Sequence, residues 1–167
     1  MFKSLLLISL SISALFVQAQ DKPKASPPAT TTGTIAGSTI TINYSQPSVK
    51  GRKIWGELVP YGKVWRTGAN EATTFETSKN ITVAGQALPA GKYSLFTIPG
   101  ENEWTIILNN EAEQFGAFTY KEKKDKIRFY SKPAKAPAFT EKMTFLIEGS
   151  QVKLRWENLE IAFPVAQ

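Results

Sequence analysis

Residues 143–156 read MTFLIEGSQVKLRW, and this stretch decides the fold. Apolar side chains stand at every second position in both halves of it: Met143, Phe145 and Ile147, then Val152, Leu154 and Trp156. Alternation with a period of two is typical of a β-strand that buries one face. Gly149-Ser150 lies between the two runs and predicts a two-residue hairpin turn of type II′. These residues therefore predict two antiparallel, half-buried strands.

The same alternation recurs over most of the chain. It is carried by β-branched and aromatic residues, namely Ile40, Ile42, Tyr44, Tyr93, Leu95, Trp104, Ile106 and Leu108. Residues 88–91 and 99–102 have the composition of turns, and only residues 53–59 and 111–118 have room for a helical turn. The pattern predicts an all-β fold, a two-sheet antiparallel sandwich or jelly roll of about eight or nine strands with one long ordered loop.

The apolar spacing slips near the C-terminus. Trp156 is followed by Leu159, so the interval is three instead of two. A β-bulge at Glu157-Asn158 would keep both sides of the slip facing the core. Pro164 is expected to end this strand, because proline cannot donate to a sheet ladder.

The first residues have the pattern of an export signal. Lys3 precedes an apolar segment that is too short to span a bilayer, and Val17-Gln18-Ala19 fits a cleavage site after Ala19. We therefore expect a signal peptide over 1–19, a periplasmic or extracellular protein, and no membrane span after cleavage. Residues 20–33, rich in proline and threonine, predict a flexible leader, and residues 34–167 a single β-sandwich domain.

Composition removes several classes of chemistry. The chain has 167 residues with no cysteine and no histidine. Disulfides, zinc sites built from Cys or His, and nucleophilic catalysis with a histidine base are excluded. Asp21 and Asp125 are the only aspartates, so a calcium site through Glu71 and Asn70 has little support. We expect no metal and no cofactor.

The excess of positive charge does not indicate nucleic-acid binding. The 20 Lys and Arg against 14 Asp and Glu give a formal charge of +6. These basic residues are scattered, and their densest run, 121–126, mixes both signs. Export would also separate the protein from cytoplasmic nucleic acid. We therefore predict no nucleic-acid partner.

Residues 44–74 are the segment that the strand pattern does not explain. They read YSQPSVKGRKIWGELVPYGKVWRTGANEATT, with little alternation but much apolar surface, so an ordered loop that folds back onto the sandwich is expected. Gly68 allows a positive φ or a close backbone approach. Polar and aromatic side chains concentrate here, and the candidate ligand-binding residues are Arg52, Tyr61, Trp65, Arg66, Asn70 and Glu71.

A structural explanation of the same residues stays open. Arg66 and Glu71 would then pair and fix the loop, Asn70 would bond turn backbone, and Trp65 would belong to the core. Trp104 and Trp156 alternate with strand residues, so for these two a core position is favoured over ligand contact.

Three sequence runs resemble a known bacterial family. They are YSxPSxKGR from Tyr44, VPYGxVWRTGANEAT from Val59 and LPAGKYSLFTIP from Leu88. Together they resemble the secreted proteins of the domain-of-unknown-function 2911 family over residues 38–163. The resemblance implies export and a β-rich fold, and places Arg66, Gly68, Asn70 and Glu71 in the family signature. It implies no reaction.

Three functional hypotheses follow. The leading one is a non-catalytic exported sandwich whose 44–74 loop binds a small polar or anionic ligand or a cell-envelope glycan. The second is a glycosidase-like hydrolase with carboxylates of the same loop, for which Glu57 and Glu71 are the candidates and Glu71 the catalytic choice. The third is an envelope assembly module that pairs its strand edges with a partner.

Overall fold

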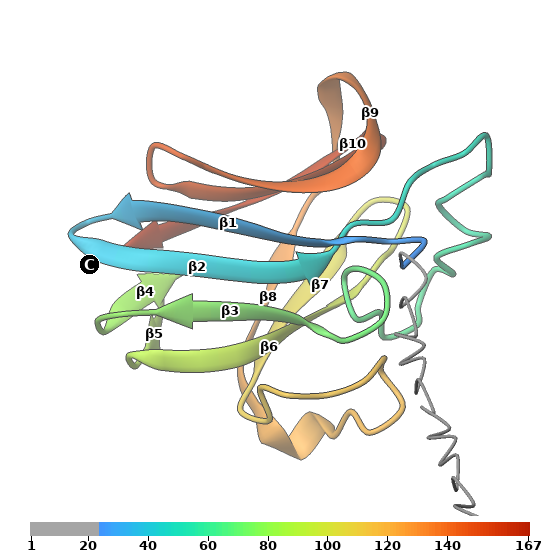
Figure 1. The fold of residues 1–167 in the computed structure, drawn as a ribbon. Coiled ribbons are helices and arrows are strands. Elements are labelled where there is room, and N and C mark those ends of the chain that lie inside the picture. The colour runs from blue at the N-terminus through green and yellow to red at the C-terminus, as the bar shows by residue number, and fades with distance from the viewer. Residues whose placement is uncertain (1–23) are drawn as a thin grey trace, which may run out of the picture.

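The computed structural model describes residues 24–167, which form two antiparallel β-sheets (Figure 1). The larger sheet has the strand order β1 (Pro28–Ile35), β2 (Ser38–Ser45), β3 (Thr73–Thr77), β6 (Gly91–Ile98), β7 (Trp104–Asn109) and β8 (Asp125–Ser131). The smaller has the order β5 (Gln86–Leu88), β4 (Ile81–Val83), β10 (Gln151–Ala166) and β9 (Ala134–Glu148). The predicted all-β sandwich is confirmed. The predicted signal peptide lies outside the described residues.

The core lies between the two sheets and uses the alternating residues. Ile40, Ile42, Phe75, Leu95 and Phe145 are all at most 2% exposed. Glu148 pairs with Gln151 across the predicted hairpin, and Gly149 has a φ of 59°, which fits the first position of a type II′ turn. No helix among residues 24–167 is long and apolar enough to cross a membrane.

The first strand begins earlier than the sequence predicts. The flexible leader was expected to reach Gly33, but residues 28–33 belong to β1, which pairs with β2 from Pro28↔Ser45 to Ile35↔Ser38. This expectation was wrong. The sequence of β1 has few large apolar side chains, so the apolar alternation that predicts the other strands is weak there. Instead, the Thr31 hydroxyl donates to the Phe145 carbonyl at 2.9 Å, and Gly33 lies against Ile147, where a Cβ atom would come within 2.8 Å.

The end of β10 confirms one expectation and corrects another. The bulge is present, because the register with β9 shifts on both sides of Glu157, whose φ is 57°. Pro164 does not end the strand, which continues to Ala166. Pairing of β10 with β9 stops at Glu160, so the missing N–H of Pro164 breaks no bond to β9. On the opposite edge of β10, the Pro164 carbonyl accepts a hydrogen bond from the Ala84 N–H.

The expected helical turns are not formed. Residues 53–59 make non-helical turns closed by a bridge between Trp55 and Val59, and residues 111–118 form a loop that ends in a turn from Gly116. One turn of 3₁₀ helix, η1 (Glu122–Lys124), lies instead within the basic run 121–126. Glycines in both segments favour turns over helix.

Four tryptophans form a cluster at one end of the sandwich. Trp104 comes from the larger sheet and Trp156 from the smaller, while Trp55 and Trp65 come from the loop between β2 and β3. Trp55 lies with its ring centroid 5.0 Å from Trp104 and 5.7 Å from Trp156, and Trp65 stacks on Trp156 at 6.0 Å. Trp104 and Trp156 are buried, as predicted. This tryptophan cluster joins both sheets and the loop.

We expect Trp104→Ala to lower the free energy of unfolding by about 3–5 kcal/mol, because it leaves a cavity beside the indoles of Trp55 and Trp65. Urea unfolding followed by circular dichroism measures this. Tyr130→Ala is the matched control, since Tyr130 is 67% exposed on β8 and its removal should change the free energy by less than about 0.5 kcal/mol. Equal effects of the two variants would contradict the role given to the cluster.

Candidate functional site

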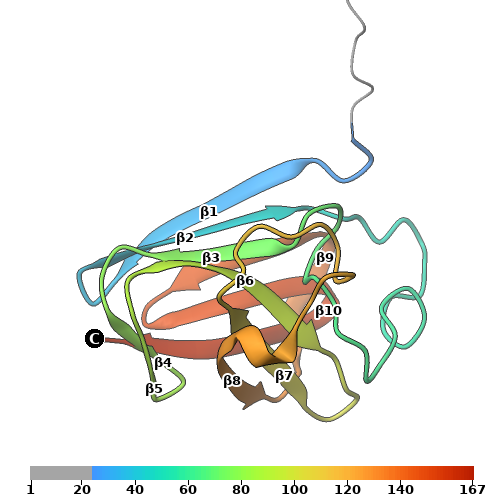
Figure 2. The ribbon, with the colours of Figure 1, turned by 90° about the horizontal axis from the view of Figure 1, so that it is seen from below.

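Residues 46–72, called here the connecting loop, are ordered and fold back onto the sandwich, as the sequence predicts. The loop covers the end of the sandwich away from the C-terminus (Figures 1 and 2). Trp65 and Thr97 of β6 exchange two backbone hydrogen bonds of 2.7 and 2.9 Å. Val49 N–H donates to the Glu141 carbonyl at 2.8 Å, and Ala69 N–H to the Ser45 carbonyl at 3.2 Å. The loop is therefore fixed to both sheets.

Gly68 allows a close backbone approach, whereas its neighbours take the left-handed conformation. Thr67 and Asn70 each have a φ of 55°. A Cβ atom on Gly68 would lie 3.1 Å from both the Ser45 carbonyl oxygen and the Thr73 hydroxyl. Buried side-chain bonds complete the turn: the Thr73 hydroxyl donates to the Thr67 carbonyl at 2.7 Å, and the Thr67 hydroxyl to Thr97 Oγ1 at 3.1 Å.

Arg66 and Glu71 do not pair with each other, so the structural explanation is wrong on this point. The Glu71 carboxylate pairs with the Lys24 ammonium at 3.1 Å, and both side chains are more than half exposed. The Arg66 guanidinium is half-buried, burial lowers its pKa, and its Nε has no hydrogen-bond partner. The two charges line different concave surfaces.

The Asn70 side-chain amide bonds to two residues that are distant in the sequence. Its side-chain amide donates to the Ser26 carbonyl at 3.2 Å and to the Ser45 hydroxyl at 3.1 Å. Ser26 lines the smaller concave surface and Ser45 the larger, so the Asn70 side chain bridges the two. The Asn70 side chain therefore has a structural role, but its partners lie outside its own turn, unlike in the structural explanation.

The smaller surface, called here the arginine hollow, brings together half of the predicted residues. It has a volume of about 200 Å³ and is lined by Ser26, Pro47, Arg52, Leu58, Val59, Trp65, Arg66, Gly68, Ala69 and Trp156. Trp65 has a double role, because it packs in the tryptophan cluster and lines this hollow. Tyr61 lines neither surface, although it is 37% exposed.

A row of polar residues crosses the outer face of the six-stranded sheet. Each member pairs in register with the next on the neighbouring strand, so all point to the same face: Thr30, Asn43, Thr74, Ser94, Asn109 and Asp125. Sequence reasoning missed this row. The polar positions of each strand can be read from the sequence, but only the register of six strands aligns them.

One half of this polar row is covered by residues 110–121, called here the cover loop. Ser94 donates to the Glu111 carbonyl at 2.8 Å, and Asn109 to the Lys121 carbonyl at 3.0 Å and Asp125 Oδ1 at 2.8 Å. The Gln114 side-chain amide donates to Ser94, Asn109 and the Glu111 carbonyl. The buried hydroxyl and amide groups of this half are thereby satisfied.

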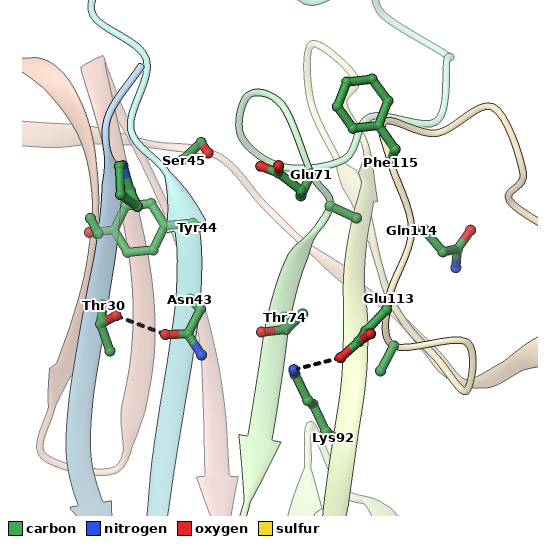
Figure 3. A pocket seen from close by; sticks show the side chains of 14 residues that line it. Thr30, Asn43, Tyr44, Ser45, Glu71, Thr74, Lys92, Glu113, Gln114 and Phe115 are labelled. Atoms are coloured by element: carbon green, nitrogen blue, oxygen red, sulfur yellow. Dashed lines mark hydrogen bonds and ion pairs between the residues drawn. The ribbon is translucent and has the colours of Figure 1, made fainter. Parts of the chain in front are cut away.

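The other half of the row is open and lies in the larger concave surface, the sheet-face groove (Figure 3). The groove has a volume of about 550 Å³, and its lining comes from β1, β2, β3, β6 and both loops: Pro28, Ala29, Thr30, Asn43, Tyr44, Ser45, Glu71, Ala72, Thr74, Lys92, Ala112, Glu113, Gln114 and Phe115. Its volume is in the range of small-molecule sites. Of the predicted residues, only Glu71 lines it.

Thr74 is the one buried polar residue of this lining whose side chain lacks a partner. It is 8% exposed, and its hydroxyl bonds to no described residue. In Figure 3 it lies between Asn43 and Lys92. Beside it, Thr30 donates to Asn43 Oδ1 at 2.7 Å, so the amide group of Asn43 remains as a donor without a partner among residues 24–167.

The charges of the groove are compensated in pairs. Glu71 pairs with Lys24, and Glu113 with Lys92 at 3.4 Å. A backbone hydrogen bond at Glu71 and then the Lys24 ammonium lower the pKa of the Glu71 carboxyl. Among the described residues, no three His, Cys, Asp or Glu side chains gather to hold a metal ion.

The comparisons with known proteins identify only a family. The model of a family described as protein of unknown function (DUF2911) matches residues 26–165. No curated protein and no solved structure matches the chain. The match includes the connecting loop, the cover loop and every strand, except the last residue of β10.

Two substitutions of Asn70 distinguish the contribution of its hydrogen bonds to stability from the contribution of its backbone conformation. Asn70→Gly should lower the free energy of unfolding by about 1–2 kcal/mol, because two hydrogen bonds are lost. Asn70→Ala should cost about 1 kcal/mol more, because alanine also resists a φ of 55°. Urea unfolding of both variants tests this, and equal stabilities would show that the left-handed conformation adds no strain.

The Tyr120 side chain ties the cover loop to β8 and predicts an alkaline dependence. Its hydroxyl donates to Asp125 Oδ2 at 2.7 Å and accepts from Arg128 at 2.8 Å. Burial and then the bond to Asp125 raise the pKa of Tyr120 to about 12. The contribution of Tyr120 to the free energy of unfolding is fully present below the pKa of tyrosine in the unfolded chain, which is about 10. It is lost as pH rises toward 12.

Urea unfolding of the wild type and Tyr120→Phe at pH 8 and pH 11 measures this effect. At pH 8 the wild type should be more stable by about 1 kcal/mol, since the variant loses the bond to Asp125. At pH 11 the difference in stability should be smaller. At this pH only the wild type takes up a proton, at Tyr120, when it folds, and this uptake becomes less favourable as pH rises. A difference independent of pH would contradict the assignment.

Proposed function

The chain belongs to the DUF2911 family, whose function is unknown, and we propose that its sheet-face groove binds a short, neutral, hydroxyl-rich ligand of the oligosaccharide class. The observation that carries the proposal is the Thr74 hydroxyl, which is buried without a partner in the lining of the groove. A buried polar group without a hydrogen bond is costly, and rotation of the Thr74 side chain toward the groove would let a ligand hydroxyl bond to it and remove that cost.

The other lining residues suit a sugar. The Asn43 amide and the Thr30 hydroxyl extend the row of hydrogen-bonding groups from Thr74 toward β1. Phe115 stands at the upper edge of the groove in Figure 3 and is 65% exposed, so a sugar ring can pack against it. An apolar side chain next to convergent polar groups is the usual composition of a small-molecule site.

The compensated charges favour a neutral ligand over an ionic one. Each carboxylate of the groove already has a lysine partner, and all four side chains are largely exposed or half-exposed. An ionic ligand would have to compete with these pairs and with water. Hydroxyl groups can instead add hydrogen bonds to carboxylates that keep their lysine partners.

The same observations argue against the hydrolase alternative. A glycosidase needs one carboxyl with a raised pKa as its general acid. The pKa of Glu71 is lowered instead. Glu57, the other candidate, is outside the groove and pairs with Lys53 at 3.0 Å. We therefore propose binding without catalysis, in a protein that is exported by the signal peptide over residues 1–19, so that cell-envelope glycans are the natural source of the ligand.

Thr74→Val tests the proposal and separates function from folding. Valine keeps the shape of threonine and removes only the unpartnered hydroxyl, so stability to urea should be unchanged or higher. Isothermal titration with cello-, chito- and xylo-oligosaccharides of the mature protein should show that affinity falls about fivefold to tenfold, as the loss of one hydrogen bond requires.

Thr41→Val is the matched control. Thr41 is on the same outer face of β2 but outside the groove lining, so this variant should bind like the wild type. If Thr74→Val also binds like the wild type, or if the wild type binds none of these sugars, the proposal is wrong. Turnover of any of them that Glu71→Gln abolishes would instead support the hydrolase.

A further inference from the structure

We infer that the arginine hollow is a second site, which binds a small organic carboxylate. The inference is independent of the groove. It rests on the charge of the hollow, on hydrogen-bond donors that have no acceptor, and on the size and walls of the space.

The charge of the hollow is positive and uncompensated. Arg52 and Arg66 line it, and no acidic residue does. No described residue forms an ion pair with either guanidinium. The guanidinium of Arg66 stays charged at neutral pH, and a half-buried cation without a counter-charge is unfavourable. A carboxylate from outside would supply that charge and fit the planar fork of the guanidinium.

Two buried hydrogen-bond donors without a partner belong to residues that line the hollow. Arg66 Nε and the indole N–H groups of Trp55, Trp104 and Trp156 are buried and have no partner. All four are donors, and Arg66 and Trp156 line the hollow. Trp65, by contrast, donates its indole N–H to the Gly68 carbonyl at 3.1 Å. No acidic side chain lines the hollow, so a carboxylate from outside would bring the negatively charged acceptor oxygens that the guanidinium lacks.

Arg52 differs from Arg66 in being held in place by the protein. Its Nε donates to the Val49 carbonyl at 3.1 Å and its Nη2 to the Ser48 carbonyl. These bonds fix an exposed guanidinium at the edge of the hollow and leave Nη1 without a partner among the described residues. We assign Arg66 as the direct ligand-binding residue and Arg52 as the second positive charge.

The volume of the hollow and the residues that line it narrow the class of ligand further. A volume of about 200 Å³ corresponds to roughly six or seven water molecules, hence to a similar number of non-hydrogen atoms. Leu58, Val59, Pro47 and the two indoles give the hollow apolar walls. These walls favour an anion with a short carbon chain over an inorganic ion.

Tryptophan fluorescence reports on this site directly. The chain has four tryptophans, all in the cluster, and two of them line the hollow. Titration of the wild type with propionate should give a saturable change in fluorescence. Propionamide, which has nearly the same shape without the charge, should give none. Inorganic phosphate at equal ionic strength should bind at least about tenfold more weakly.

Arg66→Gln should weaken propionate binding by at least about tenfold, which is the effect of losing about 1.4 kcal/mol of binding free energy. Lys63→Gln is the matched control, because it removes an exposed charge of the same loop outside the hollow and should not change binding. If Arg66→Gln fails to fold, Arg66→Lys keeps the charge without the fork and should bind measurably more weakly than the wild type.

Several outcomes would overturn the inference. It is wrong if propionamide or phosphate matches propionate, if propionate gives no saturable change, or if Lys63→Gln weakens binding as much as Arg66→Gln. Binding of propionate should also raise the urea midpoint of the wild type, because a ligand of the folded state stabilises it. The propionate test does not use the groove, so the two proposals can fail separately.

Discussion

The packing of four indoles between the two sheets is the interaction on which the rest of the structure depends. Trp104 and Trp156 belong to opposite sheets, and Trp55 and Trp65 fill the space at the end of the sandwich. A long loop without regular structure becomes ordered because its aromatic side chains are part of the core. Its fixed position then places Arg66 and Glu71 on the walls of two separate concave surfaces.

The polar row on the outer face of the six-stranded sheet has two halves with different surroundings. Ser94 and Asn109 bond to the cover loop, while Thr74, in the same row, has no partner. The cover loop thus satisfies the polar groups of one half of the row, whereas no described segment covers the other half. The open half is the basis of the proposed ligand site, and the cover loop forms one wall of the groove.

The fold could be predicted largely from the sequence because burial follows alternation. Ile40, Ile42 and Phe145 are core residues for the reason that the pattern gives. β1 could not be predicted, since its place depends on pairing with β2 and on the close contact of Gly33 with Ile147. The candidate site was predicted only in part. Arg52, Trp65 and Arg66 do line one hollow, but Glu71 lines another and Tyr61 neither.

The sequence by itself determined the all-β class, the turns, the bulge near Glu157 and the chemistry that a chain without cysteine and histidine cannot perform. Only the tertiary structure decided which polar residues share a surface. The reason is physical. Periodicity sets the face to which a side chain points, whereas strand register and loop packing set its neighbours, and both depend on residues far away in the chain.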